Sequence, residues 1–340
     1  MNHSFAMGLF VGVVTTVINV NAADDALDQR PQPWQRQPQP IFSARTTSES
    51  WCKVVLYSPH VIRANGTYRM WYVGTSTGSR IYDMGIGYAE SNDGLNWKPH
   101  PGNPVLKGEN LPYGPCFQTP FVIFDREEEN YKMWFTAVLG SATNQALGYA
   151  TSPDGVKWSV HPKPIYPSIR SPMVLKTGPA NYRMWANSDP GPGKGSLFNN
   201  IFEFSSTEGM TWTRSKSPCI RPSDLISTCV YPFVSQINGR YVMWYGGHIA
   251  GGQFELFCAT SDDGSKWEVD HKRAAFPAAD GKERFDSRYT STPSVVVEKD
   301  RILLYYSARD WNRDYIDSKG QKKRDGSSPY SHIGVAVMKR

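Results

Sequence analysis

Residues 59–72 of this 340-residue chain, PHVIRANGTYRMWY, contain the pattern that decides the fold. A proline and a hydrophobic run are followed by a short polar turn and then by Tyr-x-Met-Trp. The same order returns at Pro120, Pro172 and Pro232, and in a looser form at Pro293, with spacings of 61, 52, 60 and 61 residues between successive prolines. A nearly constant spacing of this kind is typical of a repeat architecture.

A second pattern follows the first in every repeat except the last. It reads IGYAESNDGLNW in residues 86–97 and LGYATSPDGVKW in residues 147–158, and its Ser-x-x-Gly-x-x-Trp end returns in residues 206–212 and 261–267. Because Asp-Gly pairs favour tight hairpin turns, each repeat is predicted to hold four antiparallel strands. Four-stranded units that repeat about an axis are the blades of a β-propeller.

The last repeat ends after its third strand, in residues 332–338. Its outer strand is predicted at the other end of the chain, because residues 34–42 (WQRQPQPIF) copy the pattern of residues 158–166 (WSVHPKPIY). Such a pairing would remove two open sheet edges. The sequence therefore predicts an all-β fold, a five-bladed β-propeller of four-stranded blades, whose ring is closed by an N-terminal strand that completes the last blade.

The N-terminus is predicted to be a signal peptide, residues 1–22, which leaves residues 23–340 as a single propeller domain. Residues 6–20 form an apolar core of the right length, and the small residues that follow fit cleavage before Ala23. The apolar run is short for a membrane span. We therefore expect a secreted or periplasmic protein with no membrane contact after cleavage.

Charge and cysteine content argue against several other classes. The net charge of +6 comes from scattered Lys and Arg with no basic stripe among aromatic residues, so no nucleic-acid partner is expected. None of the five cysteines has the spacing of a metal site, although Cys219 and Cys229 stand close enough in sequence to bridge one loop. No cofactor is expected.

The repeated phrases resemble the five-bladed propeller glycosidases, which include glycoside hydrolase families 43, 32 and 68 and the mannoside phosphorylases of family 130. The resemblance covers residues 34–340. It implies a carbohydrate substrate and three carboxylates at the starts of innermost strands, the first of them directly before a proline. It is also compatible with Ca²⁺ in the central tunnel, without assigning ligands. Here the residues before the five prolines carry no acid, so that triad does not transfer; they are Ser58, Thr119, Ser171, Tyr231 and Thr292.

Candidate site residues are expected on one face of the ring, where the connections into the innermost strands and the loops between the second and third strands meet. These segments are long and varied, whereas the Asp-Gly turns of the opposite face are short and repetitive, and binding residues concentrate on variable loops. The catalytic candidates are Asp83, Asp189, His248, Asp286 and Asp310. The substrate-binding candidates are Tyr57, His60, Gln118, Arg170, Tyr231, Arg288 and Trp311.

Two chemistries and one non-catalytic role fit these residue types. A glycoside hydrolase, the leading hypothesis, needs two carboxylates that flank the scissile bond. A polysaccharide lyase needs instead a Tyr or His that moves the proton beside a uronate carboxyl group, and an Arg that neutralises that carboxylate. The third hypothesis is a glycan-binding propeller without activity. The tryptophans of the repeats are interpreted as packing residues, because they recur at the same place in each unit.

Overall fold

The computed structural model describes six stretches of the chain, to which every structural statement below refers. They are residues 34–78, 84–141, 144–188, 198–249, 252–326 and 329–340. The predicted signal peptide lies outside the described residues. The described part of the chain contains no helix long and apolar enough to cross a bilayer.

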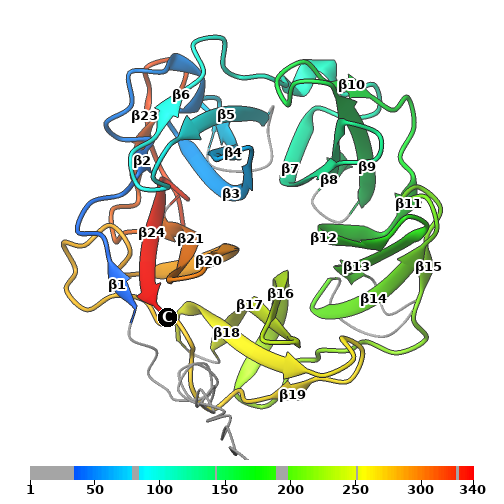
Figure 1. Ribbon diagram of the computed structural model, residues 1–340. Coiled ribbons are helices and arrows are strands. Elements are labelled where there is room, and N and C mark those ends of the chain that lie inside the picture. Colours follow the sequence, from blue (N-terminus) through cyan, green and yellow to red (C-terminus); the bar gives the residue numbers. More distant parts are fainter. Residues whose placement is uncertain (1–33, 79–83, 142–143, 189–197, 250–251, 327–328) are drawn as a thin grey trace, which may run out of the picture.

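Antiparallel β-sheet makes up most of this structure, which confirms the predicted all-β class. The helical elements that the structure describes are two short 3₁₀ turns, η1 (Ser50–Cys52) and η2 (Gly108–Asn110). Figure 1 shows the sheets arranged around a common centre, with β3, β7, β12, β16 and β20 innermost.

Four groups of strands follow the repeats directly, and the first three of them are separate sheets. The first holds β3 (Val55–Ala64), β4 (Thr67–Thr75), β5 (Gly85–Ser91) and β6 (Lys98–Pro99). The second holds β7 (Cys116–Asp125), β8 (Asn130–Ser141), β9 (Asn144–Ser152) and β10 (Ser159–Val160), and β11 (Tyr166–Pro167) also pairs with β9. The third holds β12 (Ile169–Gly178), β13 (Asn181–Ser188), β14 (Asn200–Ser206) and β15 (Thr213–Arg214). The fourth group holds β16 (Ile226–Ile237), β17 (Arg240–Ile249), β18 (Phe254–Ser261) and β19 (Glu268–Val269), and one parallel pair, Phe254 with Tyr289, joins it to the remaining strands in a nine-stranded sheet.

The remaining strands bring the two ends of the described chain together. β20 (Tyr289–Val297), β21 (Arg301–Arg309) and β24 (His332–Lys339) continue into β1 (Gln35–Arg36), and β2 (Phe42–Ser43) also pairs with β24. The register places Gln35 opposite Val337 and Phe42 opposite Ile333, both antiparallel. In Figure 1 the blue β1 lies beside the red β24. A small hairpin, β22 (Asp314–Ile316) with β23 (Lys322–Arg324), lies between β21 and β24 in the sequence.

Repeated aromatic side chains join neighbouring groups of strands at four places. Trp71 is fully buried, and its indole N–H donates to the carbonyl oxygen of Gly155, in the Asp-Gly turn of the second sheet, at 2.8 Å. Trp134 and Trp185 make the same bond to Gly209 and Gly264, and Tyr305 OH donates to Gly94 O at 2.9 Å. The pattern supports the packing interpretation of these tryptophans. It also explains the repeated glycine, since Gly155 has φ +78° and an added Cβ would lie 3.0 Å from the Trp71 ring.

All five cysteines are free thiols, so Cys219 and Cys229 form no disulfide in this structure. Burial raises the pKa of the Cys52 and Cys229 thiols to about 12. Protonated thiols of this kind behave as small hydrophobic packing groups. Across the described residues, no three His, Cys, Asp or Glu side chains gather where they could hold a metal ion.

Candidate functional site

A ring of strained residues surrounds the axis at the point where each innermost strand reaches its proline. The residues before the prolines are all left-handed: Ser58 (φ 54°), Thr119 (44°), Ser171 (54°), Tyr231 (57°) and Thr292 (45°). Each innermost strand has a register shift at the same place. This conformation is unfavourable for any residue with a Cβ and most unfavourable for threonine, so the surrounding structure must impose it.

Side chains from neighbouring sheets hold the backbone amides of this ring. Ser58 N donates to Ser307 Oγ at 2.6 Å, and Ser171 N donates to Thr136 Oγ1 at 2.8 Å. Tyr231 N donates to Asn187 Oδ1 at 3.1 Å. All three acceptors stand two residues after the Trp or Tyr of the repeat, on second strands. A polar side chain at this repeat position therefore holds the strained backbone in place and does not serve to bind a ligand.

A continuous band of aromatic rings and guanidinium groups lies at the N-terminal ends of the innermost strands, above the strained ring. We call it the aromatic–arginine belt; its members are Tyr57, Arg170, Phe198, Tyr231, Phe254, Tyr289, Arg309 and Tyr330. On one side, Tyr57 stacks on Tyr330 with ring centroids 5.4 Å apart, and the guanidinium carbon of Arg309 lies 3.7 Å above the Tyr330 ring. The belt brings together residues from three of the sheets and from loops between their strands.

The other half of the belt connects the fifth group of strands to the third sheet. Arg309 also lies over Tyr289 at 5.1 Å, and Phe254 contacts both Tyr289 (6.2 Å) and Tyr231 (6.1 Å). Arg170 follows, with its guanidinium carbon 5.5 Å from the Tyr231 ring and 5.7 Å from Phe198. Three of the substrate-binding candidates, Tyr57, Arg170 and Tyr231, are thus members of one belt.

Four further candidates stand next to the belt. Gln118 on β7 donates to Met84 Sδ, which also accepts from Tyr57 OH. Arg288 lies over Tyr289 at 5.4 Å and over Trp311 at 5.2 Å, and Trp311 is 42% exposed. His248, half-buried at the end of β17, has its ring 6.4 Å from Tyr289. The face predicted from the loops therefore does gather polar and aromatic groups from distant parts of the sequence.

Burial controls the ionisation of the two belt tyrosines nearest Arg170. It raises the pKa of Tyr57 well above the usual value of a phenol, assisted by Cys116, Tyr231 and Tyr330 and opposed by Arg170. Burial also raises the pKa of Tyr231, again against the charge of Arg170. Both phenols are therefore protonated at neutral pH and act as hydrogen-bond donors.

Two of the predicted catalytic acids are engaged in ion pairs. The carboxylate of Asp286 is fully buried and accepts from Arg36 (2.9 Å), Arg284 (3.0 Å) and Tyr306 OH (2.8 Å). Asp310 pairs with Arg45 at 2.7 Å and with His332 Nε2 at 3.1 Å. Burial alone would raise the pKa of Asp310, but the bond to His332 and the charge of Arg45 outweigh it and lower the pKa. Asp83 and Asp189 lie outside the described residues.

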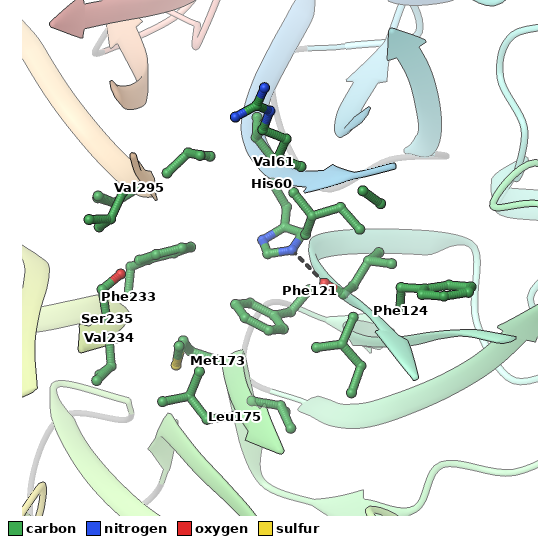
Figure 2. A pocket seen from close by; sticks show the side chains of 18 of the residues that line it. His60, Val61, Phe121, Phe124, Met173, Leu175, Phe233, Val234, Ser235 and Val295 are labelled. Carbon is green, nitrogen blue, oxygen red and sulfur yellow. Dashed lines mark hydrogen bonds between the residues drawn. The ribbon is translucent and has the colours of Figure 1, made fainter. Parts of the chain in front are cut away.

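His60 is not brought together with the other candidates. It follows the first proline and lines a separate cavity of about 960 Å³ at the opposite end of the axis, where its ring lies 4.2 Å from Phe121 and 6.2 Å from Phe233 (Figure 2). Between the two ends, the prolines and their neighbours surround a space of only about 30 Å³, which has room for water but not for a sugar ring. The two ends of the axis are therefore separate environments.

Acid is expected to destabilise the protein through His60. Burial lowers its pKa to about 4, although the bond between Nε2 and Val122 O (2.8 Å) opposes the shift. Since the unfolded histidine takes up its proton near pH 6.5, the folded state loses about 3 kcal/mol of stability as the pH falls from about 6.5 to about 4. Urea unfolding at several pH values should show a smaller loss over this window for His60→Gln than for the wild type. The His161→Gln variant, which removes a partly exposed histidine, should behave like the wild type. An unchanged dependence of stability on pH in His60→Gln would contradict the assignment.

Sequence reasoning missed three belt residues as site candidates. Phe198 and Tyr330 stand at the ends of connections between second and third strands, and Phe254 opens the third strand of its sheet. The only feature of the sequence that could have indicated a site residue there is the presence of an aromatic residue at or beside a connection. It could not be separated from a packing residue, because none of the three occupies a repeated position.

Comparison with known proteins identifies the fold but not a named family. No protein-family model matches the chain. The uncharacterized protein Rv1502 of Mycobacterium tuberculosis strain H37Rv is 28% identical over 195 residues, and this match covers 54% of the present chain and 63% of the relative. The match thus spans less than two thirds of the length of that relative.

Solved structures resemble the chain over nearly its whole length. A glycoside hydrolase aligns with a TM-score of 0.67 at 14% identity, covering 90% of this chain and 92% of the other. A glycosyl hydrolase from Bacteroides ovatus gives 0.64 at 16% identity (89% and 92%), and a thermostable family-43 glycoside hydrolase gives 0.63 at 14% identity (86% and 92%). The chain therefore has the fold of the propeller glycoside hydrolases.

Proposed function

We propose that this chain is a carbohydrate-active enzyme that cleaves an oligosaccharide or polysaccharide outside the cytoplasm, with the aromatic–arginine belt as its substrate-binding surface. One observation carries the proposal: the belt joins side chains from distant repeats at the loop-bearing end of a scaffold that glycoside hydrolases share. Aromatic faces suit the apolar face of a pyranose, and protonated phenols donate to its oxygens. Export is inferred from the apolar residues 6–20 alone.

We further propose that the sheets are the five blades of a ring that β1 closes. The pairing of β1 with β24 supports closure, and so does the bond from Tyr305 to Gly94, because it joins the last group of strands to the first. Closure matters for function, since it fixes Arg309 and Tyr330 beside Tyr57 across the junction.

Hydrolysis is the leading chemistry. It requires an acid and a second carboxylate beside the scissile bond. Asp286 and Asp310 are engaged in ion pairs, so we assign the acids to the loops between second and third strands, where Asp83 and Asp189 stand in the sequence. Glu255 on β18 is an additional candidate, because burial raises the pKa of its carboxyl group. The hydrogen bond from Ala278 N and the charge of Arg36 lower the pKa, but burial has the larger effect. A carboxyl group with a raised pKa is suited to donate a proton.

A lyase is the second candidate, and the belt favours it specifically. β-Elimination removes the proton beside a uronate carboxyl group, breaks the bond to the departing oxygen and returns a proton to that oxygen. Arg170 would neutralise the carboxylate, and the protonated Tyr57 or Tyr231 would donate to the departing oxygen rather than act as the base. His248, half-buried beside Tyr289, is the described group best suited to remove the proton.

Product analysis on a panel of neutral and uronate-containing polysaccharides tests the proposal. Hydrolysis produces new reducing ends without ultraviolet absorbance, whereas elimination produces reducing ends together with the absorbance of an unsaturated sugar. We expect Tyr231→Phe, which keeps the ring but loses the hydroxyl donor, to lower the rate about 10- to 1,000-fold without unfolding the protein. Binding without any product across the panel would overturn the enzyme and support a glycan-binding propeller.

A further inference from the structure

Arg170 occupies an unusual position among the arginines of this protein. It lies on the innermost strand β12, between the rings of Tyr231 and Phe198. Within the described residues its guanidinium group forms no hydrogen bond and no ion pair, and its Nε is buried without a partner. By contrast, Arg183 of the neighbouring strand β13 donates from Nε to Glu203 at 2.9 Å and from Nη1 to Asp263 O at 2.8 Å.

A partly buried guanidinium group for which the described residues supply no anionic partner is costly. It has lost part of its hydration, and its contacts with aromatic rings replace only part of that loss. Structural arginines in this chain avoid the cost by pairing with carboxylates, as Arg36 does with Asp286 at 2.9 Å. Arg170 therefore has the properties of a group that waits for a ligand rather than of one that stabilises the fold.

The surroundings of Arg170 favour an anion. The charge of Arg170 acts on both Tyr57 and Tyr231, and the charge of Arg309 also acts on Tyr231. Burial keeps both phenols protonated, so their hydroxyl groups donate hydrogen bonds rather than repel a negative charge. Two cations and the protonated phenol of Tyr231 thus lie in the same part of the belt, whereas the Tyr57 hydroxyl group already donates to Met84 Sδ.

We propose that Arg170 is the centre of an anion subsite that receives the carboxylate or sulfate group of an acidic sugar. A planar guanidinium group matches the two oxygens of a carboxylate or sulfate in a bidentate arrangement. The ring of the same sugar then packs on the partly exposed aromatic rings of the belt, which are those of Tyr231, Tyr289 and Tyr330. The inference rests on the proposed function for the sugar, but it holds for hydrolysis and elimination alike, because it concerns recognition and not bond cleavage.

Equilibrium binding to matched pairs of oligosaccharides tests this subsite in the full-length mature protein. Each pair consists of a glucuronate- or galacturonate-containing oligosaccharide and the same compound with its carboxyl groups reduced to alcohols; a sulfated neutral oligosaccharide and inorganic sulfate complete the set. We expect the wild type to prefer one acidic member over its reduced partner, and Arg170→Met to weaken binding of that member about 30-fold or more, as loss of one partner of a buried charge pair does. Arg170→Lys should retain part of the preference.

Two control measurements separate recognition from folding and from general charge effects. The melting temperature of Arg170→Met should stay close to that of the wild type, because Arg170 is only partly buried and forms no ion pair with the described residues. Arg126→Met removes one positive charge from the exposed rim of the opposite cavity and should leave binding unchanged. Equal weakening in both variants would mean that the effect is non-specific, and would overturn the subsite.

The outcomes distinguish this subsite from the proposed enzyme. Arg170-dependent binding of an acidic oligosaccharide without any product supports the subsite and contradicts the enzyme. Cleavage of a neutral glycan at the same rate in wild type and Arg170→Met supports the enzyme and overturns the subsite. Preference for the sulfated compound over the carboxylates supports the subsite and identifies its anion as a sulfate ester, whereas binding of inorganic sulfate alone overturns a role in sugar recognition.

Discussion

Asp286→Ala is expected to lower the free energy of unfolding by about 3–5 kcal/mol, the usual cost of removing one partner of a buried ion pair. The Asp286 carboxylate is 0% exposed and holds Arg36, Arg284 and the Tyr306 hydroxyl group. Arg36 belongs to β1, so this carboxylate fastens the N-terminal strand to the rest of the molecule. Its removal leaves two guanidinium groups without their main partner. Urea denaturation of the two proteins at neutral pH measures the loss.

A matched control distinguishes this effect from the loss of any ion pair. Asp262 pairs with Arg240 at the same distance of 2.9 Å, but the two side chains are 84% and 46% exposed. Exposed pairs of this kind contribute less than about 1 kcal/mol, so Asp262→Ala should be close to wild type. Limited proteolysis should in addition cut residues 34–43 of Asp286→Ala faster. If Asp286→Ala were as stable as the wild type but had lost its turnover, Asp286 would again be a candidate for a catalytic acid.

Asp125→Ala is expected to have an effect of similar size at a different junction. The Asp125 carboxylate is 0% exposed and binds Lys132 at 2.8 Å, Lys176 at 2.8 Å and Tyr182 OH at 3.0 Å. Lys176 and Tyr182 belong to the third sheet, so the carboxylate joins the second sheet to the third. Loss of about 3–5 kcal/mol should follow, because both ammonium groups are poorly solvated. Glu127→Ala removes an exposed partner of the same Lys176 and should cost less than about 1 kcal/mol.

The acid range adds an independent test of Asp125. Burial alone would raise the pKa of Asp125, but the bonds from Lys132, Lys176 and Tyr182 outweigh it and hold the pKa well below the usual value. A folded-state pKa below the unfolded value of about 3.9 means that the stabilisation is present above that pH and is lost as the pH falls further. Asp125→Asn should therefore show a smaller loss of stability below about pH 4 than the wild type. An identical acid profile would contradict the assignment.

The structure brings some of the predicted site residues together and separates others, for reasons that particular residues illustrate. Tyr57, Arg170 and Tyr231 were predictable, because each stands at the entry to an innermost strand on the loop-bearing face. His60 lies only three residues after Tyr57, yet the strained bulge at Ser58 and the proline after it separate their environments. Asp286 and Arg36 are 250 residues apart in the sequence, so no local sequence pattern could predict that they pair.

The sequence by itself determined the repeat, the four-strand unit and the position of the N-terminal strand, because these follow from turn chemistry and from side chains that must recur wherever one sheet packs on the next. Trp71 and Gly155 are conspicuous in the sequence for that reason. Only the tertiary structure decided which polar residues are free to bind a ligand. Whether a carboxylate or a guanidinium group is already paired depends on partners from other repeats, as Asp286, paired with Arg36, and Arg170, whose Nε has no partner among the described residues, show.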